Sequence, residues 1–132
     1  MAYLLDTDTC IYVLKNANPQ LIAKFNNHEG ALATSAIVLH ELYYGAEGYI
    51  EAGKRYSLID QLAHRLRILP FDQAIASTAG VLRYSLRKSG QQIGPYDILI
   101  AATALAHDLT LVTGNQREFS RIKDLKTENW MS

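Results

Sequence analysis

Short, continuous apolar runs recur along this chain and are separated by longer amphipathic segments. Runs of this length without alternation are typical of strands that are buried on both faces, as in a parallel sheet. Four such strands are predicted at residues 2–6, 32–34, 67–69 and 109–112, and the segment 127–130 can add an edge strand. The apolar pattern therefore predicts a central parallel sheet of four or five short strands.

The segments between these runs carry apolar residues at helical spacing and begin with residues that suit helix starts. Pro19 and Pro95 fit the first turn of a helix, and Ser35 and Asp72 are predicted N-caps. The predicted helices cover approximately residues 7–14, 19–26, 36–46, 54–65, 73–88 and 95–107. Strands that alternate with helices predict a three-layer α/β/α fold, and 132 residues correspond to a single domain over 1–132.

Net charge, the length of the apolar runs and the cysteine count each argue against some classes of protein. The formal net charge is zero, which argues against binding bulk nucleic acid through overall charge but leaves room for a local basic patch. The chain has no run of about 18 apolar residues and no basic start followed by a long apolar segment, so neither a membrane span nor a secretory signal is expected. Its lone cysteine, Cys10, is expected to be a buried structural thiol, which fits a protein of the reducing cytoplasm.

Two aspartates follow the first predicted strand, in the stretch YLLDTDTC. Functional sites of parallel sheets gather beyond the carboxyl ends of the strands, which makes Asp6 a candidate for chemistry. Each aspartate also has a structural interpretation as the N-cap of the following helix. Because Asp6 still belongs to the end of the strand, Asp8 is the preferred cap.

Three more acids occupy positions at which a purely structural role is a poor explanation for a carboxylate. Glu41 falls on or beside the buried stripe of its helix, where a carboxylate is costly unless it is paired or bound to metal. The alternative is an acid at the edge of the stripe that bonds to His40 or to a lysine. Asp97 begins a helix that is apolar nearly all round, although it could simply complement the helix dipole. Glu118 follows the fourth predicted strand, where it could also be a solvated loop acid.

Asp6, Glu41, Asp97 and Glu118 thus flank one predicted surface, and none has a cationic partner nearby in sequence. Ligand sets made of oxygen alone suit Mg²⁺ or Mn²⁺ rather than Zn²⁺. A zinc site is further disfavoured because the histidines are scattered without ligand spacing, at His28, His40, His64 and His107. Such an acid cluster can activate water and hold a phosphate through one or two divalent ions.

The stretch from Asp6 to Thr9 is also similar to the first motif of haloacid-dehalogenase-type phosphatases. In that interpretation Asp6 is the nucleophile, Asp8 is an acid, and Thr34 supplies the second motif. That family then requires a lysine and a late acidic pair, whereas the fourth strand here leads into Thr113, Gly114 and Asn115. The phosphatase remains the alternative, together with a binding module of weak catalytic activity.

Four segments in order, LLDTDTCIY, SAIVLHELYYGA, GPYDILIAATALA and LVTGNQREF, closely resemble PIN-domain ribonucleases of the VapC toxin type. The resemblance implies a PIN-like fold and a divalent-metal-dependent endoribonuclease that uses water to cut RNA, leaving a 5′-phosphate and a 3′-hydroxyl. Asp6, Glu41 and Asp97 match the core acids of this family, and Glu118 matches its fourth, more variable acid. The supporting positions are matched by Thr113, Asn115 and Asp8, the last of which is Asn in many relatives.

The same resemblance implies further partners. They are Mg²⁺ with Mn²⁺ as an alternative, a VapB-like antitoxin that relieves inhibition of translation, a second copy in a homodimer, an RNA such as transfer RNA, and promoter DNA that is bound only through the antitoxin. RNA could be held by basic residues on two segments, Arg83, Arg87, Lys88 and Arg117, although each group could be a solvated charged face. Unpaired bases could stack on Tyr12, Tyr43, Tyr44, Tyr84 or Tyr96, most of which equally suit a core or an interface.

Overall fold

The computed structural model describes residues 2–131, and its centre is one sheet of five parallel strands in the order β3-β2-β1-β4-β5. The strands are β1 (Tyr3–Leu5), β2 (Leu32–Ser35), β3 (Arg67–Leu69), β4 (Thr110–Val112) and β5 (Thr127–Glu128). The predicted parallel sheet is therefore confirmed, and each observed strand overlaps the predicted one.

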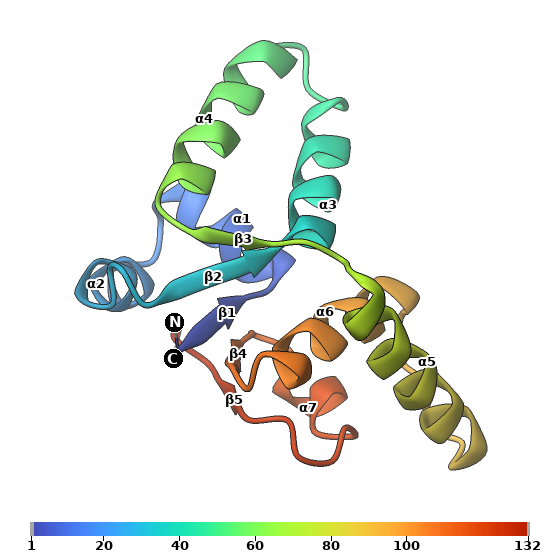
Figure 1. Cartoon of the computed structure of the whole chain (residues 1–132). Coiled ribbons are helices and arrows are strands. Elements are labelled where there is room, and N and C mark those ends of the chain that lie inside the picture. The colour runs from blue at the N-terminus through green and yellow to red at the C-terminus, as the bar shows by residue number, and fades with distance from the viewer. Residues whose placement is uncertain (1, 132) are drawn as a thin grey trace.

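Seven helices surround this sheet within the described residues. They are α1 (Thr7–Lys15), α2 (Pro19–Asn27), α3 (Ala36–Ala46), α4 (Ala52–His64), α5 (Gln73–Lys88), α6 (Pro95–Ala106) and α7 (Gln116–Phe119). The hairpin of α3 and α4 extends to one side of the sheet, and α5, α6 and α7 lie on the other side (Figure 1). Six of the helices were predicted, whereas the short α7 was not. None of the helices in residues 2–131 is long and apolar enough to cross a membrane.

The order of the strands determines where a site can form. From the central β1 the chain moves outward through β2 to β3, and it then crosses back to build β4 and β5 on the other side of β1. The direction of the strand order therefore reverses between β1 and β4, where Leu5 is paired with Val112. Crevices at such a reversal, beyond the carboxyl ends of the strands, are the usual ligand sites of open α/β sheets. Asp6 and Thr113 are the first residues beyond these two ends.

The core on both faces of the sheet is mostly aliphatic, and it also contains three buried aromatic side chains, Phe25, Phe119 and Trp130. Leu4, Leu5 and Leu111 in the strands and Ile100 in α6 have no exposed surface. Cys10 is also fully buried, and burial raises the pKa of its thiol far above the usual range. The prediction of a buried structural thiol is confirmed, and a buried protonated thiol is a poor nucleophile.

Helix caps agree with the sequence except at α1. Ser35 and Asp72 cap α3 and α5 as predicted, accepting hydrogen bonds from the backbone N–H groups two and three residues ahead. The N-cap of α1 is Asp6, whose Oδ1 accepts a hydrogen bond of 2.9 Å from the Thr9 N–H, so the prediction that favoured Asp8 is wrong. Asp6 still has an extended backbone as it leaves β1, which aims its carboxylate at the first turn, whereas Asp8 is already helical and exposed.

Candidate active site

The four predicted acids come from four separate segments and meet at the reversal of the strand order. Asp6 follows β1, Glu41 lies in the second turn of α3, Asp97 in the first turn of α6, and Glu118 in α7. The negative charges of Glu118, Glu41, Asp6 and Asp8 all raise the pKa of Asp97, in that order of importance. The structure thus brings together the acids that the sequence places up to 112 residues apart (Asp6 to Glu118).

Asp6 is the most enclosed of these acids, with 6% of its surface exposed. Burial raises the pKa of its carboxyl, hydrogen bonds with Thr113 and Thr9 lower it in part, and the charge of Asp8 raises it slightly. Its backbone N–H donates to the Val112 carbonyl at 3.1 Å, which continues the pairing of β1 with β4. Asp6 is therefore fixed by both its main chain and its side chain.

Glu41 is half-buried beside the inward face of α3, which carries Val38 and Leu42. Its Oε1 accepts a hydrogen bond of 2.6 Å from the Thr7 hydroxyl. This partner differs from the histidine or lysine considered from the sequence, and His40 instead packs its ring against Tyr96 at 5.3 Å. Thr7 lies 34 residues from Glu41, so no local sequence signal could have identified the contact.

Asp97 is half-buried, and its pKa is raised to about 6. Burial is the largest cause, and the four neighbouring carboxylates add to it. The positive end of the α6 dipole acts in the opposite direction, since it favours an anion in the first turn. Burial and repulsion outweigh the dipole, so the alternative role of Asp97 as a simple dipole complement does not account for its environment.

Glu118 is half-buried rather than a solvated loop acid. Its Oε1 accepts a hydrogen bond of 3.1 Å from the Gly94 N–H at the start of α6, and its Oε2 accepts one of 2.9 Å from the Asn115 side-chain amide. The Asn115 N–H in turn donates to the Thr113 hydroxyl at 2.9 Å. These bonds join the end of β4, α7 and the start of α6 into one framework around the acids.

The chemistry of this cluster suits a divalent cation. Within residues 2–131 the one side-chain ion pair joins Arg65 to Glu29, neither of which belongs to the cluster, so no cation of these residues is paired with the acids. Oxygen ligands and clustered negative charge are what Mg²⁺ and Mn²⁺ prefer. No three His, Cys, Asp or Glu side chains of the described residues already lie close enough to hold a metal ion. The acids are near enough to repel one another, and small side-chain rotations would be needed for them to converge on an ion.

The predicted RNA-binding side chains do not form one patch. Arg83 and Arg87 line a common cleft at the end of α5, Lys88 lies on a neighbouring face of the same helix, and Arg117 is exposed on α7. Among the tyrosines, Tyr43 is committed to the structure because it stacks on Tyr56 and donates to Asp60 at 2.6 Å. Large exposed surfaces remain on others, namely Tyr12, Tyr44, Tyr84 and Tyr96.

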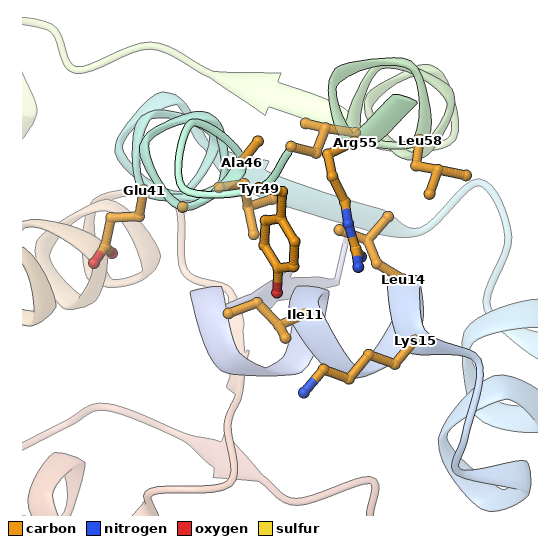
Figure 2. Close-up of a pocket in the computed structure, with 11 residues that line it drawn as sticks. Ile11, Leu14, Lys15, Glu41, Ala46, Tyr49, Arg55 and Leu58 are labelled. Carbon is orange, nitrogen blue, oxygen red and sulfur yellow. The ribbon is translucent and has the colours of Figure 1, made fainter. Parts of the chain in front are cut away.

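An apolar groove starts at the acid cluster and runs between α1, α3 and α4 (Figure 2). We call it the α1/α3/α4 groove, and its volume is about 170 Å³. Glu41 stands at one end and Leu58 toward the other, and the Tyr49 ring and the Arg55 guanidinium, which pack together at 4.0 Å, lie between them. Lys15 also lines the groove, but most of its wall is formed by aliphatic side chains, among them Ile11, Leu14, Leu42, Leu58 and Ile59.

Comparison with known proteins finds one family over nearly the whole chain. The PIN domain model matches residues 3–125. The ribonuclease VapC2 of Haemophilus influenzae is 39% identical over 131 residues, which cover 99% of each chain. The tRNA(fMet)-specific endonuclease VapC of Shigella flexneri is 35% identical over 130 residues, which cover 98% of each chain.

Solved structures give the same result for the fold. A DNA-bound VapBC complex from Salmonella typhimurium contains a chain that superposes with a TM-score of 0.95 at 35% identity, covering 98% of both chains. A VapBC2 complex from Rickettsia felis, bound to a fragment of its promoter, has a chain with a TM-score of 0.92 at 36% identity, covering 98% of this chain and 99% of that one. These chains share both the five-stranded core and its surrounding helices.

Proposed function

This chain belongs to the PIN domain family, and from that premise we propose that it is the endoribonuclease toxin of a type II toxin–antitoxin pair, of the VapC kind. The observation that carries the proposal is the acid cluster at the reversal of the strand order, in a chain similar to VapC ribonucleases along its whole length. Its action on RNA would inhibit translation until an antitoxin of the VapB kind binds it. The setting of this reaction would be the cytoplasm.

Mg²⁺, or Mn²⁺ in its place, would be the cofactor of the proposed reaction. Asp6 and Asp97 would be the main ligands, with Glu41 and Glu118 completing the site, because these four carboxylates lack other cationic partners among the described residues. A bound divalent ion would neutralise the mutual repulsion of the acids, make water a better nucleophile and offset the charge of the phosphate.

The residues of the chain would hold the reactants in place. Glu41, fixed by the Thr7 hydroxyl, would orient the attacking water. That water would attack phosphorus and the bond to the 3′-oxygen would break, which leaves a 5′-phosphate and a 3′-hydroxyl. Glu118 would hold the start of α6 through Gly94, so that Asp97 keeps its position toward Asp6. Asp8, exposed near the cluster, would add negative charge at its rim.

The antitoxin would dock in the α1/α3/α4 groove. Two solved relatives are complexes of VapC-type chains with their VapB partners. In this chain the groove offers an aliphatic surface that ends at Glu41, which suits a segment with an apolar stripe and a cationic residue. Such a segment would shield the acids and neutralise them. Promoter DNA, named in the same two complexes, would be contacted through the antitoxin.

The substrate would be a structured RNA such as transfer RNA, on which a relative from Shigella flexneri acts by name. The test is to incubate purified, antitoxin-free protein with total transfer RNA and Mg²⁺, beside samples with EDTA and with the Asp97→Asn variant. Discrete fragments that are absent from both controls are the expected result. Intact RNA with both Mg²⁺ and Mn²⁺ would contradict the proposal.

The phosphatase alternative is not favoured. Its nucleophile would be Asp6, whose carboxylate is buried and already accepts the capping hydrogen bond from Thr9. The similar proteins from Shigella flexneri and Haemophilus influenzae are an endonuclease and a ribonuclease by name, which supports the nuclease instead. Release of phosphate from a small phosphomonoester, measured beside the RNA assay, would restore this alternative.

A further inference from the structure

A second cleft lies between the last turns of α5 and the segment 92–95 that leads into α6. We call it the α5/α6 cleft, and its volume is about 540 Å³. Leu86 and Ile93, both nearly buried, supply an apolar floor. The rim is polar and cationic, because Arg83 and Arg87 are exposed. An apolar floor beneath free guanidinium groups is a surface that can take both parts of a nucleotide, its base and its phosphate.

The two arginines are not explained by the stability of the chain. They lie four residues apart on one face of α5, where like charges repel and destabilise a helix slightly. Neither forms a side-chain ion pair within the described part of the chain, in which the single ion pair is that of Arg65 with Glu29. A cation in the last turn complements the helix dipole, which accounts for Arg87 but not for Arg83 one turn earlier. Their charges are therefore available to a ligand.

Aromatic surface adjoins these charges. The Tyr84 side chain is 65% exposed and lines the cleft beside Arg83 and Arg87, and Pro95 lines the cleft from the start of α6. The exposed Tyr84 ring is thus next to both cations, within reach of the same ligand. Aromatic and proline surfaces are suited to stack on an unpaired base, whichever base it is.

The cleft is joined to the acid cluster by a short, fixed segment. Pro95 and Asp97 belong to the same first turn of α6, so the Pro95 edge of the cleft lies within about one helical turn of Asp97. The segment is held at two points, where the Gly94 N–H donates to Glu118 and where the Gln92 carbonyl accepts from Arg121 at 3.0 Å. The wall of the cleft is thus already in place before any ligand binds.

We infer that the α5/α6 cleft binds the nucleotide that flanks the scissile phosphodiester, with its phosphate on Arg83 and Arg87 and its base against Tyr84. This inference rests on the proposed endoribonuclease function and adds where the RNA is held. It also explains how a chain of zero net charge holds RNA, since two unpaired cations on the rim of the cleft supply a local attraction. The base must be unstacked to enter, so the cleft selects single-stranded RNA.

The test measures binding without cleavage, in the Asp97→Asn background with Mg²⁺ present. A labelled oligouridylate of about ten nucleotides is titrated by fluorescence anisotropy over a range of salt concentrations. Adding Arg83→Ala and Arg87→Ala is expected to weaken binding about tenfold and to reduce the slope of log affinity against log salt by about one. The matched control is Lys24→Ala with Arg67→Ala, which removes two exposed cations from elsewhere on the chain.

A second variant separates the base from the phosphate. Tyr84→Ala is expected to weaken binding about tenfold without changing the salt slope, because stacking releases no counterions, and Tyr84→Phe is expected to bind as the parent does. These side chains are exposed, so circular dichroism and the melting temperature should match the parent. Affinity and salt slope equal to those of the Lys24/Arg67 control in the arginine variant would overturn the inference. So would loss of antitoxin binding with RNA binding retained, which would assign the cleft to the protein partner.

The same variants with Asp97 intact separate this inference from the proposed function. On transfer RNA, loss of Arg83 and Arg87 is expected to raise KM about tenfold and to leave kcat nearly unchanged. If the unaltered protein cuts RNA and the arginine variant does so with the KM of the control, the inference fails and the nuclease stands. If the unaltered protein cuts no RNA while binding still depends on the arginines, the nuclease fails and the cleft stands.

Discussion

The α1/α3/α4 groove and the α5/α6 cleft adjoin the acid cluster at different residues and differ in their lining. The groove has a volume of about 170 Å³ and mostly aliphatic walls, although Lys15 and Arg55 also line it, whereas the cleft has a volume of about 540 Å³ and combines two arginines with an exposed tyrosine. Glu41 stands at the end of the groove, and Pro95, in the same turn as Asp97, stands at the end of the cleft. A protein inhibitor and a nucleic-acid substrate can therefore be recognised on separate surfaces, each of which lies next to a residue of the acid cluster.

The largest effect is expected at the acid cluster itself. Asp97→Asn removes a charge from the cluster and should lower RNA cleavage by about a thousandfold or more, because it removes an acid proposed to hold the metal. Affinity for the antitoxin and for single-stranded RNA should stay within a fewfold of the parent. The measurements are kcat on transfer RNA and two binding titrations of the same preparation.

A large loss of binding on both surfaces would mean that Asp97 shapes the groove and the cleft together, so that the two surfaces are not independent. The matched control is Asp124→Asn, which removes one carboxylate that is not part of the acid cluster. It is expected to cleave as the parent does.

The next effect concerns the groove alone. Leu14→Asp and Leu58→Asp each place a charge on a half-buried aliphatic wall, and should weaken antitoxin binding about tenfold to a hundredfold, because a carboxylate would replace apolar surface that the partner must cover. Cleavage of RNA by the free variants should be unchanged. Surface plasmon resonance with the VapB-like partner and the cleavage assay measure the two effects. If both variants bind the partner normally, the antitoxin docks elsewhere.

A smaller effect is expected where the groove meets the acids. Thr7→Val keeps the shape of the side chain but removes the hydroxyl that holds Glu41, and kcat should fall about tenfold, as for the loss of a hydrogen bond to a charged group. Thr7→Ser should retain activity. RNA affinity should not change, so the effect should appear in kcat and not in KM. An unchanged kcat in Thr7→Val would show that Glu41 needs no such support.

The smallest effect is on stability and tests the acids without RNA or partner. The pKa of Asp97 is about 6 in the folded chain against an ordinary value of 3.8, so the folded state binds its proton more tightly than the unfolded state does. Its contribution to stability is therefore complete below about pH 4 and is lost as the pH rises through about 6. In EDTA, Asp97→Asn should melt a few degrees above the parent at pH 7 and close to it at pH 4. A constant difference between the two pH values would contradict this account.

Much of the fold could be predicted because its signals are local. Continuous apolar runs marked the strands, and caps such as Ser35 and Asp72 marked the helix starts to the residue. The short α7 was missed because four residues carry too little periodicity to be recognised, although its Phe119 is buried. The cap of α1 was misassigned because Asp6 and Asp8 are chemically equal candidates, and the backbone direction at the end of β1 decides between them.

The candidate site could be predicted as a set of acids but not as an arrangement. Asp6, Glu41 and Asp97 each stood out because a carboxylate adjoins apolar sequence, and the structure brings them together. The contact of Thr7 with Glu41 and the bond from Gly94 to Glu118 join segments that are 34 and 24 residues apart, and depend on how the helices pack on the sheet. The pairing of Arg83 and Arg87 with an apolar floor likewise requires the packing of α5 against α6.

The two roles of Asp6, in the acid cluster and at the start of α1, have a genetic consequence. The residue is at once a proposed ligand and the N-cap of α1, and asparagine caps a helix as well as aspartate does. A single-nucleotide change converts an aspartate codon into an asparagine codon, so one mutation can abolish the proposed activity and leave the fold intact. A cell that carries such an allele would still make a folded, harmless copy with its α1/α3/α4 groove unaltered. That copy would continue to sequester antitoxin from any active toxin that shares it.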